Sequence, residues 1–170
     1  MAGRRAIEIH ATAILIGDAG LLIRGASGAG KSALALALMA TAQGRGLSCA
    51  LVGDDRVRLA VEDGRLVARG HPAIAGKIER RGIGVLEKPY ASEAAVRLLI
   101  DLAPWADVER LPEGPDDSGL DHDGWSFAGL PRRALEGVVL PALRLPAGAC
   151  VSDLALAILE RRRWPDVRHF

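Results

Sequence analysis

The feature that most constrains this chain is residues 25–32, which read GASGAGKS and match G-x-x-x-x-G-K-[ST] at every fixed position. A short run rich in β-forming residues at 21–24 precedes this segment, and an Ala- and Leu-rich stretch over residues 31–43 follows it. The pattern predicts a strand, a glycine-rich loop and a helix in that order. Backbone amides of such a loop surround phosphate oxygens, and the following helix directs its positive end toward them. The sequence therefore predicts an α/β fold that binds a nucleotide.

Within this loop, two side chains are expected to carry chemistry of their own. Lys31 can reach the β- and γ-phosphates of ATP, and the Ser32 hydroxyl is placed to bind Mg²⁺. The alternative is a glycine-rich turn with an incidental lysine, but the predicted strand and helix lie on the sides that a phosphate loop requires. The expected nucleotide-binding residues are Gly25, Ala26, Ser27, Gly28, Ala29, Gly30, Lys31 and Ser32.

Composition and length restrict the class of nucleotide-binding protein. The chain contains no asparagine, so it cannot carry the Asn-Lys-x-Asp element with which GTPases read guanine. Its 170 residues leave little room for the coupling segments of a mechanical ATPase. A net charge of +1 and an aromatic content of 4% argue against nucleic-acid binding. A kinase remains, and a kinase needs carboxylates near the phosphate loop.

Three acidic residues and one histidine are candidates for that chemistry. Asp54 and Asp55 follow the apolar run at residues 48–52, so a carboxylate there can join the Mg²⁺ shell or accept a hydroxyl proton. A polar turn that ends the strand is the alternative. Glu79 could complete a metal shell, although a solvated charge cluster fits residues 79–81 equally well. His10 alone is typical of a surface or satisfied core histidine.

The remaining pattern predicts one α/β domain over residues 1–170, with a mixed sheet and β-hairpins flanked by helices. The two cysteines have no metal or disulfide spacing, and the N-terminal apolar run is too short to span a membrane, so a cytoplasmic location is expected.

The predicted elements are hairpins at residues 11–24 and 57–69, a short helical or loop stretch from 73 leading into a strand at 83–86, a short helix or strand at 91–101, loops at 109–124 and 141–148, and a helix at 152–163 capped by Ser152 or its neighbour. In the loop at 109–124, His122 is interpreted as solvated rather than as a metal ligand.

Four sequence elements, taken together, resemble the catalytic domain of bacterial HPr kinase/phosphorylase. They are HAT at 10–12, GASGAGKS, LVGDD at 51–55 and IERRGIGV at 78–85. In that family a His-Gly element precedes the phosphate loop by fifteen residues, a V-A-D-D element follows the helix, and an L-E-I-R-G-L-G-I signature comes later. The resemblance covers roughly residues 6–90.

This resemblance implies an ATP- and Mg²⁺-dependent protein kinase that phosphorylates a serine of HPr, the small phosphocarrier of a phosphotransferase system, and that can reverse the reaction with inorganic phosphate. It implies a fold similar to that of phosphoenolpyruvate carboxykinase and a homo-oligomer, a hexamer in the family. By position, Asp55 would be the base, supported by His10, and Lys31 would hold the transferred phosphate. Ser32 and Glu79 would bind Mg²⁺, with Asp54 beside them, and Arg110 would be the catalytic arginine.

The chain also departs from the family pattern. It begins nine residues before His10, as in short forms that lack an N-terminal domain, and Ala11 and Arg80 replace a usual glycine and a usual apolar residue. The family's P-V-R-P-G-R loop, which serves phosphorolysis, is degenerate here at residues 140–147. We therefore expect kinase activity on HPr or a paralogue, with the reverse reaction weakened. The alternatives are a P-loop kinase for a small-molecule hydroxyl and a nucleotide-binding regulatory module without transferase activity.

Overall fold

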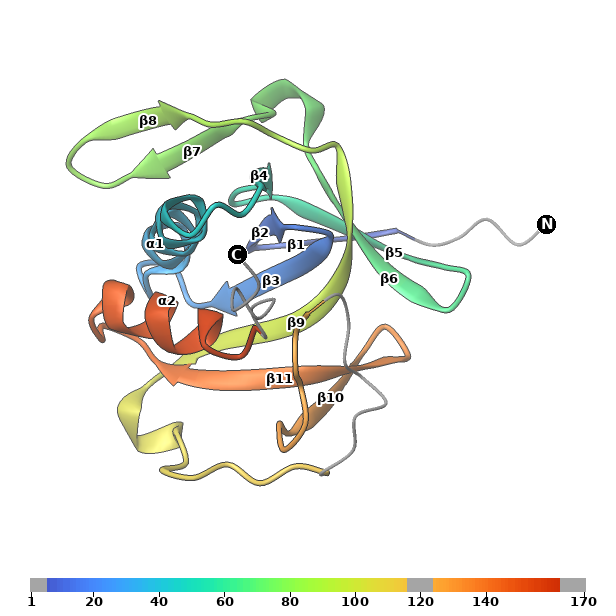
Figure 1. Ribbon diagram of the computed structural model, residues 1–170. Coiled ribbons are helices and arrows are strands. Elements are labelled where there is room, and N and C mark those ends of the chain that lie inside the picture. The colour runs from blue at the N-terminus through green and yellow to red at the C-terminus, as the bar shows by residue number, and fades with distance from the viewer. Residues whose placement is uncertain (1–5, 116–123, 163–170) are drawn as a thin grey trace, which may run out of the picture.

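The longest strand, β9, organises the fold. The computed structural model describes residues 6–115 and 124–162, and within them nine strands form one curled mixed sheet whose main order is β1-β5-β6-β9-β3-β2-β4 (Figure 1). Leu99 and Ile100 of β9 pair in parallel with both β3 and β11, so these two strands lie on opposite edges of β9. The strands are β1 (Ile7–Ile9), β2 (Ala11–Ile16), β3 (Ala19–Gly25), β4 (Cys49–Gly53), β5 (Val57–Glu62), β6 (Arg65–Gly70), β7 (Lys77–Arg80), β8 (Gly84–Glu87), β9 (Glu93–Ala103), β10 (Arg132–Leu135) and β11 (Val138–Pro146).

Both α-helices of the described residues, α1 (Lys31–Gly44) and α2 (Val151–Leu159), cover the same side of the sheet and pack on each other. Leu21 and Ile23 of β3 face this helical side, whereas Leu22 faces a second core that is built from strand residues alone. The curl of the sheet brings the edge strands over that second core (Figure 1). Both faces of β3 are therefore buried over residues 19–23, which explains why this part of the strand carries no polar side chain.

Most of the elements near the glycine loop are confirmed. The hairpin β2–β3, the helix α1, the buried strand β4 and the hairpin β5–β6 lie at or within two residues of the predicted positions. Of residues 91–101, for which helix and strand were both open, residues 93–101 belong to the strand β9, which continues to Ala103. The mixed α/β class is thus correct, with the refinement that the two α-helices lie on one side rather than on both sides of the sheet.

One local prediction is wrong, and two are right only in part. Residues 141–148, predicted as a loop, lie mostly in β11, because their two prolines stand at the ends of its pairing with β9: Pro141 just precedes that ladder and Pro146 closes it. The short helical or loop stretch predicted from residue 73 is helical only in the 3₁₀ turn η1 (Pro72–Ile74) and then forms the strand β7, whereas the strand predicted at 83–86 is present as β8. The helix predicted at 152–163 is present as α2, but its N-cap is Cys150 rather than Ser152 or a neighbour, no side chain caps it, and it ends at Leu159, before the arginines.

The predicted loop at 109–124 is described only up to residue 115 and at residue 124, and His122 lies outside the described residues. Before that loop, the 3₁₀ turn η2 (Trp105–Asp107) follows β9. In the described ranges, no helix has both the length and the apolar character needed to cross a lipid bilayer.

Candidate active site

The glycine loop, residues 25–30, connects the end of β3 to the first turn of α1. Gly28 has a φ of 78° and Gly30 has a φ of 103°. Residues that carry a Cβ rarely adopt these backbone conformations. Gly30 is the N-cap of α1 and no side chain caps the helix, so the first amides of α1 remain available to a ligand. Such a loop can bind an anion through its backbone.

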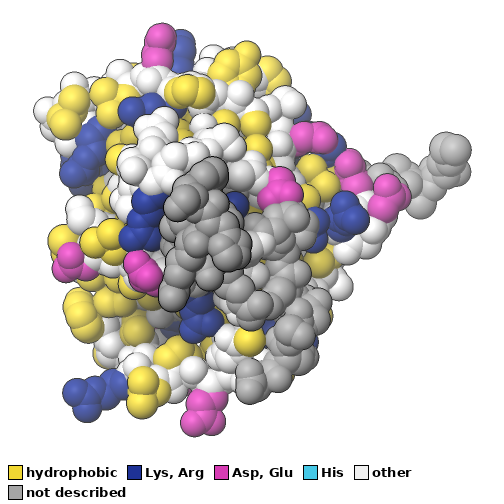
Figure 2. All heavy atoms as spheres, in the orientation of Figure 1, with side chains coloured by type: hydrophobic (Ala, Val, Ile, Leu, Met, Phe, Trp, Pro, Cys, Tyr) yellow, Lys and Arg dark blue, Asp and Glu magenta, His cyan; other side chains and the backbone are white. Residues whose placement is uncertain are grey.

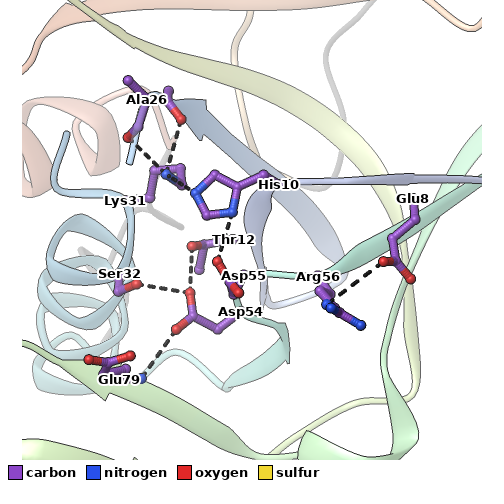
Figure 3. A network of polar contacts seen from close by, with 11 residues as sticks. Glu8, His10, Thr12, Ala26, Lys31, Ser32, Asp54, Asp55, Arg56 and Glu79 are labelled. Atoms are coloured by element: carbon purple, nitrogen blue, oxygen red, sulfur yellow. Dashed lines mark hydrogen bonds and ion pairs between the residues drawn. The ribbon is translucent and has the colours of Figure 1, made fainter. Parts of the chain in front are cut away.

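Lys31, the first residue of α1, is buried and folds back onto this loop. Its Nζ lies 3.0 Å from the carbonyl oxygens of Gly25 and Ala26 and 3.0 Å from Nε2 of His10 (Figure 3). Burial lowers the pKa of Lys31, and the nearby carboxylates of Asp54 and Asp55 oppose that shift. The structure therefore keeps a cation in a partly desolvated position where an anionic ligand would interact with it strongly.

The carboxylate of Asp54 is buried at the end of β4 and accepts three hydrogen bonds. Its Oδ1 receives the hydroxyl of Thr12 at 2.7 Å and that of Ser32 at 2.9 Å, and its Oδ2 receives the backbone N–H of Glu79 at 3.2 Å. These donors come from β2, α1 and β7, so Asp54 ties the three elements together at one point. Because Ser32 donates its proton to Asp54, the lone pairs of its oxygen remain free to bind a cation.

Asp55, next to Asp54, is oriented by His10. The Nδ1 of His10 lies 2.7 Å from Oδ1 of Asp55, and both side chains reach the surface. The Lys31 ammonium has no lone pair, so Nε2 of His10 accepts its hydrogen bond and the ring proton on Nδ1 is donated to Asp55. Asp55 also has a φ of 65°, a conformation uncommon for residues other than glycine.

A pocket of about 470 Å³ joins all of these groups. The glycine loop and α1 form one wall, and the two-stranded ribbon β7–β8 forms the opposite wall. Arg81, in the turn of that ribbon, reaches toward the loop, since a Cβ built on Gly28 would lie 3.9 Å from its Nη1. The residues that line the pocket are His10, Ser27, Gly28, Gly30, Lys31, Ser32, Ala33, Asp54, Asp55, Ile74, Lys77, Glu79, Arg80, Arg81 and Val85.

The oxygen groups in this pocket suit Mg²⁺. Ser32, Asp54 and Glu79 offer hydroxyl and carboxylate oxygens, and Figure 3 shows them side by side between α1 and β7. Nowhere in residues 6–115 and 124–162 do three or more His, Cys, Asp or Glu side chains gather closely enough to hold a metal ion by themselves. This matches the habit of Mg²⁺, which uses one or two protein carboxylates and completes its shell with water and substrate phosphates.

Most of the residues singled out from the sequence meet here: His10, Lys31, Ser32, Asp54, Asp55 and Glu79 share the pocket with Ser27, Gly28 and Gly30 of the glycine loop. Gly25, Ala26 and Ala29 do not line it. Arg110 does not line it and lies exposed in the segment after η2.

Sequence reasoning missed Thr12, Lys77 and Arg81. A polar residue among the apolar residues of β2 was the available signal for Thr12, which is fully buried. For Lys77 and Arg81 there was only a cluster of charges, which is typical of a solvated surface.

Comparisons with known proteins agree with these observations. A family model described as HPr Serine kinase C-terminal domain matches residues 4–118. A curated HPr kinase/phosphorylase of Mycoplasma mycoides subsp. mycoides is 30% identical over 149 residues, which are 84% of this chain and 42% of the relative. Another, of Clostridium acetobutylicum, is 34% identical over 123 residues, which are 66% of this chain and 38% of the relative. The chain thus spans about two fifths of the length of these relatives.

A solved structure of the Hpr(Ser) kinase/phosphatase from Coxiella burnetii has a similar fold. It superposes with a TM-score of 0.67 at 24% sequence identity, and the match covers 91% of this chain and 94% of that one. At this level of identity the likeness concerns the fold: a curled mixed sheet with α-helices on it.

Proposed function

Because the chain belongs to the HPr kinase/phosphorylase family through its HPr serine kinase C-terminal domain, we propose that it is an ATP- and Mg²⁺-dependent kinase for a serine of HPr or an HPr paralogue. The described residues would form one catalytic unit of the phosphate-loop type, related in fold to phosphoenolpyruvate carboxykinase. The reaction places the chain in the cytoplasm, where ATP and the phosphocarrier are available. A homo-oligomer, hexameric by family resemblance, is part of the same proposal.

The observation that carries this proposal is the chain of contacts from Lys31 through His10 to Asp55. It places a cation for phosphate and a carboxylate for a hydroxyl proton on opposite sides of one imidazole ring. In-line phosphoryl transfer needs both, a stabilised phosphoryl group and a base next to the attacking oxygen.

In this proposal, the amides of the glycine loop and Lys31 bind the ATP phosphates, and Arg81 offers a second cation next to the loop. Asp55 accepts the proton of the serine hydroxyl. At the same time the serine oxygen bonds to the γ-phosphorus, and ADP leaves. The Nδ1 proton of His10 holds the Asp55 carboxylate in position for that transfer. Ser32, Asp54 and Glu79 hold Mg²⁺, which neutralises phosphate charge.

A substitution of Thr12 tests the proposed Mg²⁺ site. Replacing it by valine keeps the shape of the side chain but removes the hydroxyl that donates to Asp54, so the carboxylate loses one of its three fixed hydrogen bonds. We expect the Mg²⁺ concentration for half-maximal transfer to rise about tenfold. Thr41→Val, which removes a hydroxyl bonded to a backbone carbonyl within α1, is the matched control and should leave the Mg²⁺ titration unchanged. Coinciding titrations for the two variants would remove Thr12 from the metal site.

The reverse reaction should be weak. The degenerate segment 140–147 lies largely in the strand β11, and none of its residues lines the pocket. Incubation of phosphoserine-HPr with the protein, Mg²⁺ and inorganic phosphate should therefore release pyrophosphate much more slowly than the forward reaction consumes ATP. Robust pyrophosphate release at a rate similar to that of the forward reaction would contradict this prediction.

The proposed activity is tested by incubating the protein with purified HPr, Mg²⁺ and ATP labelled at the γ-phosphate. Label should move to HPr, and chelation of Mg²⁺ should abolish the transfer. Nucleotide binding without transfer to HPr would refute the proposed kinase.

A further inference from the structure

The ribbon β7–β8 stands apart from the main sheet and has two different sides. Ile78 and Leu86, which pair with each other, face the helical core next to α1. Lys77, Glu79 and Val85 face the pocket, as their place in its lining shows. Ile83 lies in the turn directly before β8, two residues before Val85, and so stands at the edge of the pocket rather than in its lining.

The ribbon and the 3₁₀ turn before it expose apolar surface at the pocket that Asp55 also lines. Ile83 is 71% exposed and Val85 is 64% exposed, and Ile74 in the adjoining 3₁₀ turn lines the same pocket. Isolated exposed apolar residues are ordinary, but a group at the rim of one pocket indicates an interaction site. Figure 2 shows apolar and cationic side chains gathered over this part of the molecule, at the upper left.

The ribbon also carries cations without an internal partner. In the described part of the chain, no carboxylate lies within ion-pair distance of Lys77, Arg80 or Arg81. An apolar centre with a charged rim is the usual composition of a protein-binding surface.

We propose that the exposed surface made by Ile74, Lys77 and Val85 in the pocket and by Ile83 at its edge is the surface on which the acceptor protein docks. This inference rests on the proposed function, because a serine can reach Asp55 only if the surrounding surface of its protein covers the rim of the pocket. The complementary partner surface has an apolar patch beside the serine and at least one carboxylate that faces Lys77. The nucleotide, in contrast, is held by the glycine loop and Arg81.

Ile83→Asp is the most direct test, since Ile83 is exposed and lies outside the pocket lining. We expect the KM for HPr to rise at least about tenfold, with kcat and the KM for ATP nearly unchanged. Val139→Asp is the matched control: Val139 is a strand valine with 55% exposure on β11, away from the pocket, and its substitution should leave the KM for HPr unchanged.

A second variant tests the charge. Lys77→Glu should raise the KM for HPr, and added salt should reduce the difference from wild type, since screening weakens exposed charge pairs. Arg133→Glu on β10 is its control. Circular dichroism should verify that all four variants fold.

The outcomes separate this proposal from the proposed function. Equal KM values for Ile83→Asp and Val139→Asp would overturn the docking surface and leave the kinase intact. A loss of ATP binding in Ile83→Asp, or a change in its oligomeric mass, would also overturn it, by assigning the ribbon to the nucleotide or to a second copy of the chain. Calorimetric binding of HPr to wild type keeps the test independent of transfer: binding that Ile83→Asp weakens supports the surface even if the kinase fails, and no binding to wild type overturns both.

Discussion

Replacing Asp55 by asparagine should lower the rate of phosphate transfer to HPr by roughly 10²- to 10⁴-fold while ATP binding stays close to wild type. The asparagine amide occupies the same space and can still accept the hydrogen bond from Nδ1 of His10, but it cannot take the serine proton. Asparagine also tolerates the positive φ of this position, so the backbone should not change. Single-turnover transfer and equilibrium nucleotide binding, measured on the same preparation, separate the two effects.

Asp63→Asn is the matched control for this variant. Asp63 has a φ of 49° in the exposed turn between β5 and β6, so the same substitution is made at another positive-φ aspartate outside the pocket. Its transfer rate should equal that of wild type. Near wild-type transfer by Asp55→Asn would show that Asp55 is not the base.

Replacing Lys31 by methionine should weaken ATP binding and lower transfer by about 10²- to 10³-fold. Methionine fills a similar volume in this buried position, but the cation that interacts with phosphate is lost. The contacts of Nζ with Gly25, Ala26 and His10 disappear as well, so Asp55 loses the indirect link to the loop that passes through the imidazole. The measurements are nucleotide affinity and the transfer rate at saturating HPr.

Lys31→Arg sharpens this test. The planar guanidinium is larger than the ammonium and cannot make the same compact set of contacts in a buried site, so arginine should not restore activity. Lys88→Met, a change of a lysine outside the pocket, should behave as wild type. If Lys31→Met or Lys31→Arg retained nearly full transfer, the glycine loop would not be the phosphate site.

Local signals sufficed for the parts of the fold that carry the chemistry. The glycine loop, α1 and the acidic end of β4 each follow from a contiguous pattern, and their meeting at one edge of the sheet follows from the strand–loop–helix order. The hairpins β2–β3 and β5–β6 were likewise marked by short turn sequences. Interactions between residues that are close in the sequence are enough to determine these elements.

Other parts depend on distant contacts. The strand β11 exists because residues 142–146 pair with β9, about forty positions earlier, and local proline content indicates a loop instead. The hydrogen bond from Thr12 to Asp54 joins residues 42 positions apart, so the local sequence marks Thr12 only as a polar residue in an apolar strand and does not connect it with the acidic pair. The same holds for the pocket side of β7–β8, because charged residues in a short ribbon look solvated until the fold places them opposite the glycine loop.

The central claim is that the contacts from Lys31 through His10 to Asp55 serve transfer of phosphate from ATP to a serine of HPr. The most direct measurement is the mass of HPr after incubation with the protein, ATP and Mg²⁺, compared with HPr whose target serine is replaced by alanine. The account predicts the gain of one phosphoryl group on wild-type HPr, none on the alanine variant and little with Asp55→Asn. An unchanged mass of wild-type HPr, with ATP bound to the protein, would contradict it.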